Sequence, residues 1–233
     1  MSIGTIIYGP RYIGKTAFTL ALPKSTYWMT TARNSRKRNV TISGWERFTD
    51  TIVKLSEKQP YEYIVVDQFN RLYEMCVDYV CKQENEEHPS TSGNRKPLLW
   101  EKIKKEMSEQ LFTLSDCANQ IFYLTDMETK NLDSSLYKGT MMYPKLDWVL
   151  EDIMPHITQQ TIAMVPTYKS VKRVSKATGE IAYVRKEKRV MICSARPDIY
   201  AGDSTGLLPK EFDAGESGEE AFNTYNSYMK KDK

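Results

Sequence analysis

The chain has 233 residues, of which 40% are hydrophobic and 27% are charged, and its net charge is +3. This is a globular composition, and the length suits one large α/β domain or one domain with an appendage. No run approaches the roughly 18 uninterrupted apolar residues of a membrane-spanning helix, and the small net charge leaves any nucleic-acid signal to local patches.

The start of the chain and its cysteines indicate a cytoplasmic protein. The first predicted strand begins almost at residue 1, so we expect no signal peptide. The cysteines at positions 76, 81, 117 and 193 show no C-x-x-C spacing. We therefore interpret them as reduced thiols and not as a disulfide or zinc framework.

A phosphate-binding loop is the most informative stretch of the sequence. Residues 9–16 match G-x-x-x-x-G-K-[ST] at every fixed position, after an apolar strand and before a helical pattern. Gly9 and Gly14 allow backbone angles that a Cβ would forbid, so the loop can wrap its N–H groups round a phosphate. The helix that follows adds its positive dipole end. The alternative is an ordinary Gly-Pro turn with a lysine after it.

The pattern assigns a role to each part of this loop. We expect Lys15 to reach the β- and γ-phosphates and to act in catalysis, and Thr16 to place its hydroxyl on Mg²⁺. The predicted nucleotide-binding residues are Gly9, Pro10, Arg11, Tyr12, Ile13, Gly14, Lys15, Thr16 and Ala17.

A helix, a strand, a basic loop and a second helix are predicted next. The first helix covers residues 16–22 and ends at Pro23, and the strand covers residues 25–30. The loop at 32–38 carries four basic residues; it is either a solvated turn or a phosphate or nucleic-acid contact. Apolar residues at helical spacing predict an amphipathic helix over residues 44–58.

Residues 61–67 have the pattern of a Walker B strand. Ile64, Val65 and Val66 form an apolar run that ends in Asp67. Such a run suits a strand buried on both faces of a parallel sheet, and ligands bind at the carboxyl ends of such strands. We expect Asp67 to hold Mg²⁺, directly or through water, and to act in catalysis.

Two helices and another buried strand follow. The helices are predicted over residues 70–87 and 98–118, and the strand over residues 120–125. Thr125 ends this strand beside the expected site, where it either senses the γ-phosphate or simply caps the strand. The polar residues from Asp126 to Lys130 predict a loop, and residues 143–155 predict a short helix.

The periodicity changes to two from residue 160 onward. A strand is predicted over residues 161–166, and residues 168–174 and 181–193 predict a β-hairpin. Tyr168 and Tyr183 interleave with many basic residues, which is the composition of a single-strand nucleic-acid surface. The alternative is an edge hairpin protected from aggregation by its lysines. The predicted nucleic-acid contacts are Lys169, Lys172, Arg173, Arg185, Lys186 and Arg189.

The end of the chain is predicted to be less regular. Residues 195–212 predict irregular structure, and residues 213–233 predict a polar tail that frays. The predicted domain therefore covers residues 1–212.

The order of these features resembles the RecA-like phage nucleotide-binding proteins, which include the Sak-type single-strand annealing proteins. The resemblance covers residues 3–212 and includes two stretches near the end, at 194–196 and 206–209. It implies an α/β RecA-like P-loop NTPase core with a mostly parallel central sheet flanked by helices. It further implies ATP and Mg²⁺ as cofactors, single-stranded DNA as partner, and a role in phage recombination in the host cell cytoplasm, with other copies or phage recombination proteins as further partners. By position, Gly9 to Thr16 form the nucleotide loop and Asp67 is the carboxylate on the metal side.

One departure from the family pattern bears on turnover. Relatives usually carry an acidic residue just after the second strand, where it polarises the attacking water. This chain has Thr30 and Thr31 there, and no carboxylate follows before Asn34. Glu74 and Glu128 are the candidate substitutes, although neither lies in the matching place. We therefore expect nucleotide binding to survive and hydrolysis to be slow or absent.

Two other functions remain open from the sequence. A P-loop kinase would use arginines in a lid over the phosphates, and the loop with Arg33 and Arg38 could supply them. An ATP-switched assembly protein would need no nucleic acid. The long basic hairpin favours a DNA-binding ATPase over both.

Overall fold

The structure is a computed structural model. It describes residues 2–31, 39–58, 60–91, 93, 96–133, 138–174 and 181–230. At positions 169, 171–174, 181, 182 and 184–186 it describes the backbone only.

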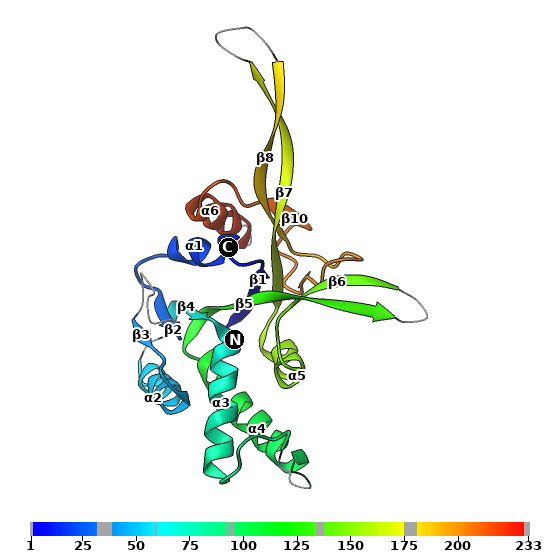
Figure 1. Cartoon of the computed structure of the whole chain (residues 1–233). Coiled ribbons are helices and arrows are strands. Elements are labelled where there is room, and N and C mark those ends of the chain that lie inside the picture. The colour runs from blue at the N-terminus through cyan, green and yellow to red at the C-terminus, as the bar shows by residue number, and fades with distance from the viewer. Residues whose placement is uncertain are drawn as a thin grey trace.

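The described residues form a large mixed sheet with helices on both faces (Figure 1). Its strands are β1 (Ile3–Gly9), β2 (Tyr27–Thr30), β3 (Val40–Thr41), β4 (Tyr61–Asp67), β5 (Ala118–Asp133), β6 (Lys138–Pro144), β7 (Gln160–Val174), β8 (Ile181–Ile192), β9 (Gly202–Asp203) and β10 (Glu211–Asp213). The helices are α1 (Lys15–Leu20), α2 (Trp45–Ser56), α3 (Phe69–Gln83), α4 (Lys96–Ser115), α5 (Trp148–Ile157) and α6 (Gly218–Met229).

The core of the sheet is parallel, as predicted. Its strand order is β10-β8-β7-β1-β5-β4-β2-β3, and every pair from β7 to β3 is parallel. β8, β9 and β10 join antiparallel at one end, and β6 pairs with β5 as a separate ribbon. The predicted fold class is therefore confirmed: a mostly parallel central sheet flanked by helices, with a C-terminal antiparallel hairpin.

Alternate residues of the central strands pack against different sets of helices. In β1, Ile6 belongs to the cluster packed under α2, α3, α4 and α5, whereas Ile7 faces α1 and α6. β5 alternates in the same way, with Tyr123 on the first face and Phe122 on the second. Burial on both faces explains why these strands read as continuous apolar runs.

Two long hairpins project from the body in Figure 1. β7 runs unbroken from Gln160 to Val174 and pairs first with β1 and then with β8, so the two predicted strands at 161–166 and 168–174 are one. β5 likewise continues past the sheet and pairs with β6. The loop predicted from Asp126 to Lys130 is therefore wrong. One face of this stretch is half-buried but carries the polar residues Glu128 and Lys130, and the other face is exposed, so the strand lacks an apolar alternation.

The described part of the predicted tail, up to residue 230, is ordered structure and not a fraying tail. Residues 211–213 form β10, and α6 packs beside α1, where Phe18 meets Phe222 and Tyr225 edge to face. The Tyr225 hydroxyl donates to Gln160 Oε1 at 2.7 Å inside the core. Burial of these two aromatic rings fixes the helix, so the prediction of a polar tail from residue 213 is wrong for residues 213–229.

The predicted helix over residues 143–155 is shifted in the structure. Tyr143 and Pro144 end β6, and α5 begins at Trp148 after Asp147, whose side chain accepts from the Val149 N–H. The four cysteines are all buried free thiols, in line with their interpretation as reduced. None of the helices formed by the described residues combines the length and apolar character of a membrane span.

Candidate functional site

The carboxyl ends of β1, β4 and β5 meet at one edge of the sheet. The register pairs Gly9 with Asp126 and Tyr8 with Thr125, and β4 ends beside them at Asp67. A cavity of about 720 Å³ opens at this edge. Ligands of open α/β sheets bind at such positions. The phosphate loop and the Walker B strand thus converge on one cavity, which we term the nucleotide cavity.

The loop between β1 and α1 depends on its two glycines. A Cβ on Gly9 would lie 2.2 Å from the backbone oxygen of Met164 in β7, which leaves no room for a side chain. Gly14 has φ +112°, and a Cβ there would lie 2.4 Å from Arg189 Nη1. Gly9 therefore requires glycine because the β7 backbone lies so close, and Gly14 requires it for its backbone angle, since the flexible end of Arg189 can move aside.

The other predicted loop residues differ in what they contact. Arg11, Tyr12, Gly14, Lys15, Thr16 and Ala17 line the nucleotide cavity. Ile13 is buried instead and anchors the loop in the core. Tyr12 has φ +64° and a fully exposed ring at the tip of the loop. The loop thus turns polar and basic groups to the cavity and fixes itself with one apolar side chain.

Lys15 lies in the mouth of the loop. Its ammonium donates to the carbonyls of Gly9 at 2.8 Å and Pro10 at 3.0 Å, and it lies 3.4 Å from Asp126 Oδ1. Burial lowers the pKa of Lys15, while the charges of Asp126 and Asp67 oppose this shift. The side chain is only 12% exposed, so it is held where a phosphate would meet it.

Asp67 and Thr16 supply oxygen atoms to the same cavity. Burial raises the pKa of Asp67, and the Gln68 backbone N–H and Lys15 oppose the rise. Carboxylate and hydroxyl oxygens are the ligands that Mg²⁺ prefers, and a nucleotide-bound Mg²⁺ needs only one or two of them from the protein. Among the described residues no cluster of three or more His, Cys, Asp and Glu side chains could hold a metal by itself. The donor set therefore fits Mg²⁺ carried in with phosphates.

Asp126 is a site residue that the sequence did not single out. Its carboxylate lies 3.4 Å from the Lys15 ammonium and 3.6 Å from Arg11 Nε. It reaches both cations because the register of β5 sets it opposite Gly9. No local signal in the sequence gives the order of strands, so this pairing could not be foreseen.

Thr125 lines the cavity with its hydroxyl engaged by the protein. The hydroxyl lies within hydrogen-bonding distance of the Asn70 side chain and 2.8 Å from the Lys145 carbonyl. Asn70 Nδ2 also donates to that carbonyl at 2.6 Å. This arrangement ties the ends of β5 and α3 together, and the sensing of a γ-phosphate by Thr125 stays a prediction.

The structure separates the two candidate substitutes for the missing carboxylate. Glu74, on α3, lines the nucleotide cavity and pairs with Arg71. Glu128 lies farther along β5 and pairs with Lys130 at 3.1 Å. Where relatives place an acid, the Thr31 hydroxyl donates to Gln68 Oε1 at 2.8 Å. Of the two, Glu74 is the one that could approach a nucleotide.

Arg189 lies at the base of the β7–β8 hairpin and against the phosphate loop. Its guanidinium packs on Gly14 and donates from Nη2 to the Gly215 carbonyl at 3.2 Å. Among the described residues it does not belong to the lining of the nucleotide cavity. A residue predicted to contact DNA is thus part of the support of the nucleotide loop.

The rest of the predicted DNA surface lies along the hairpin. Tyr168 is 61% exposed and Tyr183 is 74% exposed. The side chains of Lys169, Lys172, Arg173, Arg185 and Lys186 lie outside the described ones. The basic loop at 32–38, on which the kinase alternative depends, also lies outside the described residues.

Comparison with known proteins gives a family and a distant structural neighbour. A family model described as an AAA domain matches residues 2–205. A KaiC-like protein from the hyperthermophilic archaeon Pyrococcus horikoshii OT3 is 13% identical with a TM-score of 0.43, and the match covers 86% of this chain and 88% of that one. No curated protein matches the chain.

Proposed function

Because the chain belongs to the AAA domain family, a family of P-loop NTPases, we propose that it binds ATP with Mg²⁺ and uses its long basic hairpin to bind single-stranded DNA. The biological setting we propose is phage recombination or strand annealing, with further copies of the chain or phage recombination proteins as partners. The observation that carries the DNA-binding part is the register of β7 and β8.

Several contacts support the nucleotide half of the proposal. Lys15 and Arg11 bring two cations to the mouth of the loop, and Thr16 and Asp67 bring oxygen ligands. Lys15 would contact the phosphates, and Thr16 and Asp67 would hold Mg²⁺. Bound Mg²⁺ supplies charge neutralisation on the phosphate oxygens. A triphosphate would take the place of Asp126 as the anion that meets Lys15, whereas the exposed Arg11 would add only a weak, solvent-screened contact.

The hairpin register supports a single DNA-binding face. It pairs Lys172 with Tyr183 and Ser170 with Arg185. Cross-strand partners share a face and alternate residues change face. The positions of Tyr168, Lys172, Tyr183 and Arg185 therefore fall on one face, which we term the tyrosine face. Rings and cations on one surface are what a single strand needs, because bases stack and phosphates pair with charge.

The opposite face carries charge without aromatic rings. The register pairs Lys169 with Lys186 and Thr167 with Lys188 there. The Lys188 ammonium is bound to Asp213 of β10, so that lysine is already neutralised. With Arg189 and Lys188 set aside, the tyrosine face has two basic positions, Lys172 and Arg185, and the opposite face has three, Lys169, Arg173 and Lys186. Removing two charges from each face therefore gives a comparison that is matched in charge and differs in aromatic content.

We expect removal of two charges from the tyrosine face to weaken DNA binding and flatten its salt dependence. Each phosphate contact steepens the log–log slope by about 0.7 for single strands, so Lys172→Ala with Arg185→Ala should reduce the slope by about 1.4. The measurement is fluorescence anisotropy of a labelled single strand over a salt series, with and without ATP–Mg²⁺. Arg189 is left unchanged because it touches the phosphate loop.

The control is Lys169→Ala with Lys186→Ala, which removes the same charge from the opposite face. It should leave the slope within about 0.3 of the parent, because that face has no rings to hold a strand. Equal effects of the two double variants would remove the tyrosine face from the proposal. If the parent protein itself fails to bind DNA, the hairpin is an edge protected from aggregation by its lysines. The alternative function as an ATP-switched assembly protein is then favoured.

Hydrolysis by the isolated protein should be slow. No carboxylate occupies the position after β2, where Thr31 donates to Gln68, so the attacking water is poorly polarised. We expect a rate on the order of 10⁻² per second or below, as in P-loop NTPases that act without a partner. Steady-state phosphate release measures it, and many turnovers per second would contradict the expectation.

A further inference from the structure

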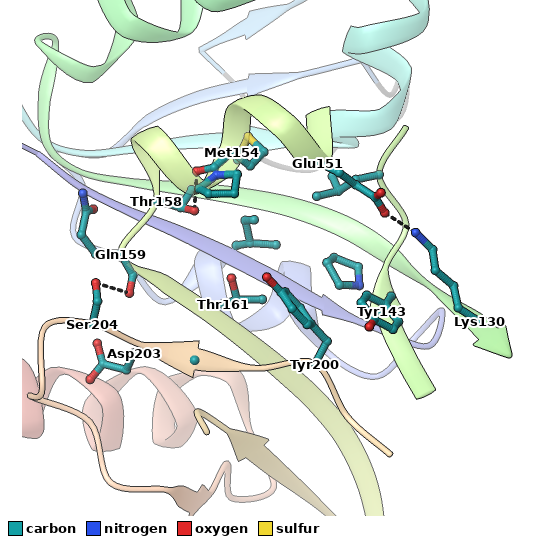
Figure 2. A pocket seen from close by; sticks show the side chains of 15 residues that line it. Lys130, Tyr143, Glu151, Met154, Thr158, Gln159, Thr161, Tyr200, Asp203 and Ser204 are labelled. Atoms are coloured by element: carbon teal, nitrogen blue, oxygen red, sulfur yellow. Dashed lines mark hydrogen bonds and ion pairs between the residues drawn. The ribbon is translucent and has the colours of Figure 1, made fainter. Parts of the chain in front are cut away.

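A second cavity, of about 750 Å³, lies between α5 and the sheet. Figure 2 shows it between α5 and the segment with Tyr200, Asp203 and Ser204. Within the described chain, none of its lining residues also lines the nucleotide cavity. Its volume falls in the range of about 300–1,000 Å³ that is typical of small-molecule sites. We term it the α5 cavity.

The floor of the α5 cavity is a row of three residues across three strands. The register pairs Ile6 of β1 with Thr161 of β7, and Thr161 with Gly202 of β9. Residues paired in this way share a face of the sheet, and all three line the cavity. A Cβ on Gly202 would meet nothing within 4 Å. The absence of a side chain at this position therefore leaves the floor flat and open.

One wall of the cavity is a fixed aromatic surface. The rings of Tyr143 and Tyr200 stack with centroids 5.0 Å apart and planes 17° apart. The Tyr200 backbone is held on both sides, because its N–H donates to the Met142 carbonyl at 2.9 Å and its carbonyl accepts from the Tyr8 hydroxyl at 2.6 Å. Tyr200 is nevertheless 45% exposed. Met154 of α5 also lines the cavity (Figure 2), so the exposed ring of Tyr200 offers a flat surface on which a planar group can stack.

The charges around the cavity disfavour an anion. Lys130 is its one lysine among the described lining residues, and this ammonium is already paired with Glu151 and Glu128. It also lies 5.1 Å from the centroid of the Tyr143 ring. The carboxylates of the lining are Glu151, which pairs with Lys130, and Asp203, whose oxygens accept from the N–H groups of Thr205 and Leu208. A cation placed over a tyrosine ring gains electrostatic energy, whereas an anion would meet carboxylates and no unpaired lysine of the described lining.

We propose that the α5 cavity binds a planar cation on an apolar body, of the amidine or guanidinium type. The ligand lies over the row of Ile6, Thr161 and Gly202 with its plane against Tyr200. This site is separate from the nucleotide cavity and from the hairpin. The proposal does not depend on ATP or DNA binding.

Three ring-matched probes test the chemistry of the site: benzamidine, benzamide and benzoate. Binding is measured by ligand-observed NMR with ATP–Mg²⁺ at saturation, which keeps a cationic probe away from the carboxylates of the nucleotide cavity. We expect benzamidine to bind at least about fivefold more tightly than benzoate, with benzamide between them, from a cation–π gain of about 1 kcal/mol. Equal affinities, tightest binding of benzoate, or no binding of benzamidine would overturn the proposal.

A second pair of probes distinguishes the source of the ligand. Blocked arginine that binds more tightly than both benzamidine and blocked citrulline would identify the ligand as an arginine side chain of a partner protein. Blocked arginine that binds more weakly than benzamidine would identify it as a free small molecule. Both outcomes support the chemistry proposed for the cavity.

Two variants locate the binding in the α5 cavity. Gly202→Leu fills the open floor, and we expect it to abolish benzamidine binding while the unfolding temperature and ATP affinity stay unchanged. Gly44→Leu is the matched control, because a Cβ at Gly44 also meets nothing within 4 Å and this residue precedes α2. Tyr200→Ala should weaken benzamidine without filling the space, which keeps the test intact if Gly202→Leu fails to fold. Unchanged binding in both cavity variants would overturn the assignment.

Discussion

Lys15→Ala should lower the affinity for ATP by at least about 100-fold, which corresponds to about 2.8 kcal/mol. The reason is that its ammonium would make charge-assisted hydrogen bonds to phosphate, each of which contributes about 1.5–3 kcal/mol. The fold should survive, because the partners of Lys15 are two loop carbonyls and Asp126 at the cavity, where water can replace the ammonium. Calorimetry gives the affinity, and thermal unfolding checks the fold.

Arg11→Ala is the control for this change. Arg11 lies in the same loop and pairs with the same carboxylate, yet its side chain is 81% exposed. Its loss should change ATP affinity by less than about threefold, as expected for an exposed pair. A folded Lys15→Ala variant that binds ATP like the parent would show that the nucleotide lies elsewhere.

Asp67→Asn should remove the Mg²⁺-dependent part of ATP affinity and, at neutral pH, stabilise the ligand-free protein. Burial raises the pKa of Asp67 above its ordinary value of 3.8, so the folded chain holds this proton more tightly than the unfolded chain. At pH values above the pKa that Asp67 has in the folded protein, its ionised side chain therefore lowers the free energy of unfolding. That cost disappears as the pH falls through the folded pKa toward 3.8. The stability gain from asparagine should be largest at pH 7 and should shrink on acidification.

Thermal unfolding over about pH 4–8 measures the stability effect, and ATP titrations with and without Mg²⁺ measure the functional one. Asp126→Asn is the matched control, since its side chain is 44% exposed and bound to Lys15 and Arg11. It should give no gain in stability. Equal losses of ATP affinity with and without Mg²⁺ in Asp67→Asn would remove Asp67 from the metal site. If Asp67→Asn instead lowers the unfolding temperature at pH 7, the attraction between Lys15 and ionised Asp67 outweighs the cost of burying that charge.

Some of the elements that were predicted wrongly nevertheless had a signal in the sequence. Ser217 precedes α6, its hydroxyl accepts from the Glu220 N–H at 3.1 Å, and Ser-x-x-Glu is the pattern of a capping box. With Phe222 and Tyr225 on one stripe, this pattern predicts the helix that the polar composition obscured. The extension of β5 had a weaker signal. Its half-buried face carries Glu128 and Lys130, so the strand lacks the apolar alternation from which strands are recognised.

Three features could be predicted from the amino-acid sequence alone: the phosphate loop, the strand that ends in Asp67 and the α/β class of the fold. These features could be predicted because each rests on residues that are contiguous in the chain, and the chemistry of a phosphate loop requires fixed residue types at fixed spacing. The basic hairpin was predicted for the same reason, from alternation and composition within one stretch.

Contacts between residues that are distant in the chain could not be predicted and were found only in the folded protein. Asp126 lies 111 residues from Lys15 in the chain, yet it lies 3.4 Å from the Lys15 ammonium because β5 is the neighbour of β1. Arg189 packs on Gly14 because β7 brings β8 to the same edge of the sheet. Strand order and register depend on the packing of the whole core, because each strand could pair with several others. No local sequence pattern specifies which of these pairings forms.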